Sequence, residues 1–135
     1  MGWGSVSPLG CDAESTWNGV LAGRSGITAL REDWSNDLPV RISGCVPDAA
    51  TGSLGPLLLR RSDRCAQLGL LAAREAWAMA TRAIAGINPA RVAVVLGTGI
   101  GGLYTMHEQH NQLTAGGPTR VNRSEERRVG KECER

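Results

Sequence analysis

The spacing of apolar residues predicts a first helix over residues 11–23. Trp17, Val20 and Leu21 recur at positions i, i+3 and i+4 and therefore share one face. Asp12 can cap this helix, because its carboxylate can accept hydrogen bonds from the free N–H groups of the first turn. Gly23 can end it in a left-handed conformation.

A longer amphipathic pattern predicts a second helix over residues 62–86. Ser62 is a plausible cap, Gly86 can end the helix, and Pro89 prevents its resumption. Spacings of three and four residues place one stripe on a single face: Cys65, Leu68, Ala72, Ala76, Met79 and Ala83. The alanines in this stripe predict close packing on a sheet or on another helix. A third helix is predicted over residues 102–117.

Two stretches have the pattern of strands. Residues 37–44 alternate Leu38, Val40 and Ile42 with other residues, which is typical of a short, half-buried strand. Residues 92–96 are apolar without polar alternation, as in a strand covered on both faces. Helices that alternate with buried strands indicate an α/β layer structure.

Composition and charge exclude several classes of protein. A length of 135 residues with 41% hydrophobic residues suits one domain, and a net charge of +2 gives no reason to expect a nucleic-acid partner. No apolar run approaches the roughly 18 residues of a membrane span, and the first ten residues lack a secretory signal. The four cysteines, Cys11, Cys45, Cys65 and Cys133, form no Cys-x-x-Cys pair. We therefore expect a cytoplasmic protein with reduced cysteines.

The stretch VAVVLGTGIGGLY, residues 92–104, contains a glycine motif between a predicted strand and a predicted helix. Gly97, Gly99 and Gly102 satisfy the Gly-x-Gly-x-x-Gly spacing of dinucleotide-binding loops. That fingerprint expects an acidic residue about 20 positions further on. The sequence there is GGPTRVN, with no strand and no acid, and no lysine follows the glycines as in a phosphate-binding loop. Nucleotide binding is therefore the weakest of the functional alternatives.

Five ordered segments resemble the beta-ketoacyl-acyl-carrier-protein synthases, the elongating condensing enzymes of fatty-acid synthesis. They are GWGSVSPLG, ESTWNGVLAGRSGI, RRSDRCAQLGLLAAREAW, VAVVLGTGIGG and TAGGPTRVN, and they run from Gly2 to Asn122. The resemblance implies an acyltransferase of the thiolase-like superfamily, here with the N-terminal half of the α/β fold only. It implies acyl carrier protein and acyl and malonyl thioesters as partners, a homodimer in the complete enzyme, and no cofactor.

The family's catalytic residues have no match in this sequence. The nucleophile belongs to a turn in which small residues follow a cysteine, and none of the four cysteines has that context. The family's two histidines lie in its later half. His107 and His110 have helical spacing but lack a third ligand, so we expect no metal site. We expect no catalytic residue here and no activity of the chain alone, and the family's first core strand is missing before Gly2.

The resemblance assigns two non-catalytic sites. Gly99 and Ile100 match residues beside the acyl-chain pocket, with a tight turn as the structural alternative. Arg60, Arg61 and Arg64 match a region that presents basic residues to the carrier protein. Here the alternative is a solvated helix start, although cations there would oppose the helix dipole. A non-catalytic module that binds acyl groups or a carrier protein is the alternative function.

The sequence divides at Asn122. Residues 1–122 resemble the synthase domain, incompletely, whereas residues 123–135 are mostly charged and contain Lys131, the only lysine among 15 basic residues. Such a segment cannot bury enough apolar surface to offset the entropy of ordering it. We expect residues 123–135 to be a disordered tail that is foreign to the family.

Overall fold

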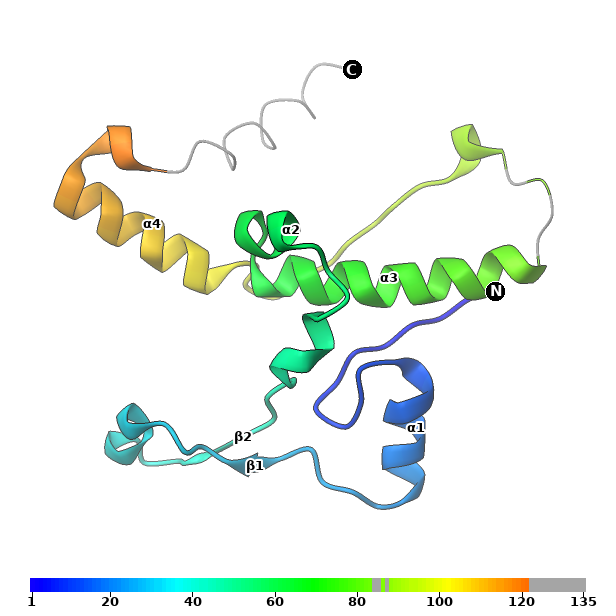
Figure 1. Ribbon diagram of the computed structural model, residues 1–135, viewed down its shortest axis with the longest axis horizontal. Helices are drawn as coiled ribbons and strands as arrows, with labels where there is room; N and C mark the ends of the chain where they lie inside the picture. The colour runs from blue at the N-terminus through cyan, green and yellow to red at the C-terminus, as the bar shows by residue number, and fades with distance from the viewer. Residues whose placement is uncertain (84–85, 87, 122–135) are drawn as a thin grey trace.

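The longest helix, α3, crosses the middle of the molecule, and the other elements surround it (Figure 1). This computed structural model describes residues 1–83, 86 and 88–121. The helices are α1 (Ala13–Leu21), α2 (Pro56–Arg61), α3 (Arg64–Ala83) and α4 (Leu103–Gly116). The strands are β1 (Thr28–Ala29) and β2 (Ile42–Ser43). Short 3-10 helices are η1 (Asp33–Asp37), η2 (Asp48–Thr51), η3 (Pro89–Arg91) and η4 (Pro118–Arg120). The predicted tail, residues 123–135, lies outside the described residues.

Helix α1 begins and ends as the sequence predicts. The Ser15 N–H donates to Asp12 Oδ1 at 2.6 Å, and the Asp12 N–H donates to Ser15 Oγ at 3.3 Å, which completes a capping box. Gly23 follows with a φ of 63°, the left-handed value that favours glycine at a helix end. The apolar stripe of Trp17, Val20 and Leu21 is exposed, however. The helix packs instead through its small residues.

Helix α3 confirms the second predicted helix and corrects its cap. The Cys65 N–H donates to Asp63 Oδ1 at 3.0 Å, so Asp63 caps the helix, whereas Ser62 ends α2. Gly86, the predicted C-terminal end, has a φ of 77° and lies beyond Ala83, the last residue of α3. Helix α4 likewise confirms the third predicted helix.

The alanine-rich face of α3 packs against the N-terminal segment, and not on any sheet or other helix of the described residues. A Cβ added at Gly2 would overlap the carbonyl oxygen of Ala76, and one added at Gly4 would overlap that of Ala72. The backbone of the N-terminal segment therefore lies so close to the backbone of α3 that no side chain fits between them at Gly2 or Gly4. Cys65, at the start of the predicted stripe, is exposed.

Glu75 of α3 fixes the same segment by hydrogen bonds. Its carboxylate accepts the Ser5 N–H at 3.0 Å and the Ala13 N–H at 2.9 and 3.1 Å. Because Ala13 is the first residue of α1, one side chain binds both the N-terminal segment and the free N–H of a helix start.

Both strand predictions need correction. Within residues 37–44 only Ile42 and Ser43 form a strand, paired antiparallel with Ala29 and Thr28. Leu38 and Val40, predicted to be half-buried, are exposed and lie outside β2, between η1 and the paired residues.

The predicted strand at residues 92–96 is wrong for this structure. The segment belongs to no sheet, and Val94 and Val95 are 91% and 93% exposed. A strand forms only where a neighbouring strand takes up its N–H and C=O groups. The one sheet in the described part of the chain has two strands, which pair only with each other.

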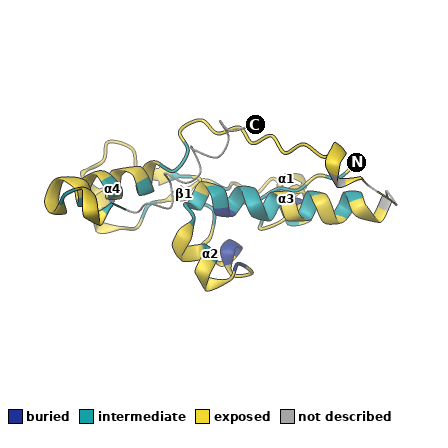
Figure 2. Cartoon of the chain, turned by 90° about the horizontal axis from the view of Figure 1, so that it is seen from above, coloured by how far each residue is buried: buried dark blue, intermediate teal, exposed yellow. Residues whose placement is uncertain are grey.

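The buried interior is small. Ala13, Ala50 and Leu54 are the buried apolar residues among those described, and each of the four tryptophans is more than half exposed. Intermediate burial follows α3 along its length (Figure 2). Helices and one short sheet are present in the described residues, but they do not form the predicted α/β layers, in which helices cover the faces of a sheet. None of the helices in the described ranges is long and apolar enough to cross a membrane.

The close approach of the N-terminal segment predicts a cost for any side chain at Gly4. Gly4→Ala places a Cβ against Ala72 and Glu75, so we expect the free energy of unfolding to fall by about 1–3 kcal/mol. Gly97→Ala is the matched control: its Cβ meets nothing within 4 Å, and we expect a change of about 0.5 kcal/mol or less. Urea unfolding followed by circular dichroism measures both. Equal effects of the two substitutions would contradict the close packing.

Candidate functional site

The predicted docking arginines lie where α2 ends and α3 begins. Pro56 occupies the first turn of α2, and Arg60 and Arg61 occupy its last turn. Cations there interact favourably with the helix dipole. This corrects the expectation that they oppose a dipole at a helix start. Both arginines are exposed, and neither makes a hydrogen bond or ion pair with any residue that the structure describes.

Gln67 holds the end of α2 against α3. Its side-chain amide donates to the carbonyl oxygens of Leu59 at 3.1 Å and Ser62 at 2.7 Å. Gln67 is 7% exposed, so these bonds are shielded from water. The orientation of α2, and with it the position of Arg60 and Arg61, therefore depends on one buried amide.

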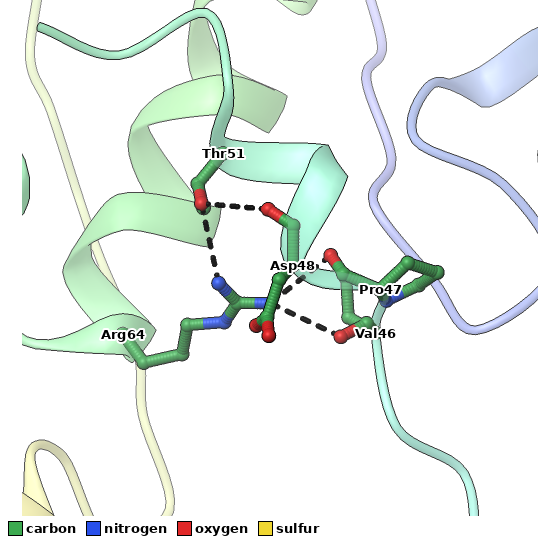
Figure 3. A network of polar contacts seen from close by, with 5 residues as sticks. All are labelled: Val46, Pro47, Asp48, Thr51 and Arg64. Atoms are coloured by element: carbon green, nitrogen blue, oxygen red, sulfur yellow. Dashed lines mark hydrogen bonds and ion pairs between the residues drawn. The ribbon is translucent and has the colours of Figure 1, made fainter.

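Arg64 has a different role from its two neighbours, as Figure 3 shows. Its Nη2 donates to the carbonyl oxygens of Val46 at 3.0 Å and Pro47 at 3.1 Å, and lies 3.4 Å from Asp48 Oδ1. Its Nη1 donates to Thr51 Oγ1 at 3.3 Å. The planar guanidinium satisfies several acceptors at once. Arg64 thus binds η2 to the start of α3.

The glycine loop, residues 97–102, contacts the start of α3 where Gly102 lies against Asp63. A Cβ at Gly102 would lie 2.8 Å from the Asp63 carboxyl carbon, so glycine is required for the approach. Asp63 Oδ2 accepts the Thr105 hydroxyl at 2.5 Å and the Thr105 N–H at 3.4 Å. The same carboxylate therefore contacts the starts of α3 and α4.

This hydrogen bonding changes the acidity of Asp63. The Thr105 hydroxyl holds the pKa of Asp63 below its ordinary value, against the opposing effect of partial burial. Asp63 is therefore a carboxylate at neutral pH, the form that accepts bonds at both oxygens.

The predicted acyl-pocket residues lie on the open side of the glycine loop. Gly101 has a φ of 74°, and its N–H donates to Thr98 Oγ1 at 2.9 Å. Ile100 is 73% exposed, and a Cβ at Gly99 would meet nothing within 4 Å. Within the chain, the close approach of this loop to another segment is made by Gly102 and not by Gly99.

The described cysteines and histidines make no hydrogen bond to one another. Cys11, Cys45 and Cys65 are free and exposed. Partial burial raises the pKa of the Cys65 thiol, and the Asp63 carboxylate raises it further, which disfavours the nucleophilic thiolate. His107 Nε2 lies 3.2 Å from the Asn111 amide. In the described ranges no three His, Cys, Asp or Glu side chains are placed to hold a metal ion. Cys133 lies outside those ranges.

Sequence reasoning missed the polar side chains that hold this region together. The sequence predicts Ser62 as the cap of α3, whereas Asp63 caps it; both residue types occur as helix caps. Gln67 and Glu75 lie between apolar positions of α3, where spacing alone gives no sign of their partners.

The sequence comparisons identify the family. The beta-ketoacyl synthase N-terminal domain matches residues 1–130, so the chain belongs to this family. Individual relatives are 3-oxoacyl-(acyl-carrier-protein) synthase 2 proteins. The Coxiella burnetii protein is 31% identical and the Vibrio harveyi and Staphylococcus aureus proteins are 34% identical, each over 122 residues and 90% of this chain. The chain spans about 30% of the length of these relatives.

Removal of the Thr105 hydroxyl tests the contact with Asp63. We expect Thr105→Val to lower the free energy of unfolding at pH 7 by about 1 kcal/mol. Thr105→Ser keeps the hydroxyl, so we expect a smaller loss of stability. Because the folded pKa of Asp63 is lowered, this stability is present above the ordinary value of about 3.9 and is lost as pH falls through the folded pKa. Denaturant unfolding between pH 2 and 7 measures the difference. A loss that is equally large at pH 2 would contradict an ionic acceptor.

Proposed function

We propose that the chain supplies the N-terminal part of a beta-ketoacyl-acyl-carrier-protein synthase with a thiolase-like fold. The observation that carries the proposal is the family match over residues 1–130. The names of the relatives, which are 3-oxoacyl-(acyl-carrier-protein) synthases, support the same reaction class. The proposed setting is cytoplasmic fatty-acid elongation by a homodimer.

The reaction is a decarboxylating Claisen condensation. A cysteine thiolate attacks the acyl thioester, and the carrier thiol leaves with a proton. Malonyl-carrier protein then loses CO₂, and the resulting carbanion attacks the acyl-enzyme carbonyl and displaces the cysteine thiolate. Partial burial and the Asp63 carboxylate raise the pKa of Cys65, the opposite of what such a nucleophile needs, and none of the four cysteines has the sequence context of the family's nucleophile turn. The residues of this chain would therefore position substrate and carrier, and the chain by itself would be inactive.

In this proposal Gly99 and Ile100 border the acyl chain. Ile100 presents an apolar side chain that is 73% exposed, so it has free surface to bury against a hydrocarbon chain. The contact between Gly102 and Asp63 fixes one end of the loop that carries it.

Ile100→Phe tests this assignment in a chimaera in which the chain replaces the matching part of the Vibrio harveyi synthase. We expect the unsubstituted chimaera to form 3-oxoacyl products and Ile100→Phe to shorten them, because the larger ring occupies space along the acyl chain. Mass spectrometry measures product length. Unchanged lengths at retained activity would reject the role of Ile100, and an inactive, folded chimaera would count against the reaction. The 135-residue chain alone is the negative control, with no acyl adduct expected on Cys11, Cys45 or Cys65.

The proposed carrier-protein surface consists of Arg60 and Arg61, with Arg64 behind them. The first two have no partner among the described residues and are exposed, so their charge is available to an acidic protein. Arg64 would act mainly by holding η2 and the start of α3 in place.

Charge reversal tests this surface. We expect Arg60→Glu with Arg61→Glu to weaken binding of acyl carrier protein to the chain about tenfold at low salt, and less at 0.5 M salt. In the chimaera the same pair should lower the use of acyl-carrier protein more than the use of a small acyl thioester. Equal losses with both substrates would contradict docking.

A further inference from the structure

Helix α3 contacts the glycine loop at both of its ends, although the two lie far apart in the sequence. At the end of the loop Gly102 lies against Asp63, and just before its start Leu96 Cδ1 lies 3.6 Å from a Cβ built at Gly69. We infer that Asp63 and Gly69 are positioning residues that set the acyl-chain length the synthase prefers, because they fix the loop that carries Ile100. This inference rests on the proposed function and assigns its length selectivity to residues of α3 that do not themselves border the acyl chain.

The two carboxylate oxygens of Asp63 have separate partners. Oδ1 accepts the Cys65 N–H at 3.0 Å and so caps α3. Oδ2 accepts the Thr105 hydroxyl at 2.5 Å and the Thr105 N–H at 3.4 Å, and the carboxyl group lies against Gly102. The cap of α3 and the position of the loop's end can therefore be changed separately by substitution of this one side chain.

Gly69 leaves the space that Leu96 occupies on α3. It lies inside the helix, where glycine is less favourable than alanine because ordering it costs more backbone entropy. A Cβ at this position would make ordinary van der Waals contact with Leu96, so alanine fits. A larger side chain would displace the Leu96 side chain. The size of residue 69 therefore determines how close the start of the loop lies to α3.

Between these two contacts, a hydrogen bond within the loop encloses Ile100. The Gly101 N–H donates to Thr98 Oγ1 at 2.9 Å, so residues 98–101 form a closed turn. Among the described residues, a Cβ at Gly97 or Gly99 would meet no atom within 4 Å, and Ile100 is 73% exposed. The turn is thus open to a ligand on the side of Ile100, and a shift at either of its ends moves this apolar side chain.

The first test compares kcat/KM for a long-chain and a medium-chain acyl thioester in the chimaera with the Vibrio harveyi synthase. A smaller folded fraction lowers both values equally, so their ratio reports length selectivity and not stability. Asp63→Ser keeps a residue type that caps helices but lacks the oxygen that binds Thr105, and we expect it to weaken the preference about threefold. Asp12→Ser is the matched control: Asp12 caps α1, and we expect less than about a 1.5-fold change in the ratio.

Gly69→Leu tests the other end of the loop. We expect it to displace Leu96 and to weaken the length preference about threefold. Gly69→Ala, whose Cβ makes only ordinary contact with Leu96, should leave the ratio within about 1.5-fold. Asp63→Asn is a second variant at the first position, should Asp63→Ser not fold. It can keep Oδ1 as the cap acceptor while an amide replaces Oδ2, and we expect it to weaken the preference in the same direction.

The second test needs no enzyme activity. In the 135-residue chain, hydrogen exchange at the Gly101 amide reports the closed turn directly. We expect Asp63→Ser and Gly69→Leu to speed this exchange about fivefold, and Asp12→Ser and Gly69→Ala to leave it unchanged. Circular dichroism of each variant confirms that α3 is retained.

The outcomes separate this inference from the proposal on which it rests. If Ile100→Phe shortens the products but Asp63→Ser and Gly69→Leu leave the length ratio unchanged, the inference fails and the proposed function stands. If Ile100→Phe also leaves product length unchanged at retained activity, both the acyl assignment and this inference fail. If the chimaera is folded but inactive, the proposed reaction is in doubt and exchange at Gly101 decides. Equal exchange in Asp63→Ser and Asp12→Ser would then overturn the inference, and faster exchange in Asp63→Ser alone would support it.

Discussion

The arrangement of the chain depends on polar side chains at the start and middle of α3, each of which binds a different neighbouring segment. Asp63 binds the start of α4, Arg64 binds η2, and Gln67 binds the end of α2. Glu75 binds the N-terminal segment and the start of α1. Few apolar residues are buried among those described. We therefore expect these hydrogen bonds to contribute a large share of the stability of the arrangement.

The same bonds decide which charges remain available to a partner. Asp63, Arg64 and Glu75 are engaged within the chain, whereas Arg60, Arg61 and Arg74 are not paired with any described residue. Residues 56–83 contain five arginines and two acidic residues, so the α2–α3 region is locally positive, although the net charge of the whole sequence is only +2. Local charge, rather than net charge, therefore favours an acidic partner.

Local signals in the sequence predicted α1, α3 and α4, because their caps and spacings act within a few residues, whereas the short helix α2 was not predicted. The Asp12 cap of α1 and the stripe along α3 are of this kind. Burial was predicted less well, because it depends on segments far apart in the chain. Val94 and Val95 have the composition of a covered strand, yet no strand in the described ranges lies beside them. Leu96, by contrast, reaches α3, where its Cδ1 lies 3.6 Å from a Cβ built at Gly69.

The candidate site was predicted in part for the same reason. The basic cluster was visible because its members are adjacent, but its division into free and structural arginines depends on carbonyl groups 17 and 18 residues away. Glycine at position 102 was recognised as part of a motif, whereas its contact with Asp63 joins residues that only the tertiary structure brings together.

Amide hydrogen exchange of Glu75→Ala and Asp63→Ala, compared with the wild-type chain, tests the role of α3 most directly. We expect Glu75→Ala to speed exchange at Ser5 and Ala13 and to leave Thr105 unchanged. Asp63→Ala should speed exchange at Cys65 and Thr105 and leave Ala13 unchanged. Exchange that rises equally in all segments, or in none, would contradict the account that separate polar contacts from one helix hold the segments in place.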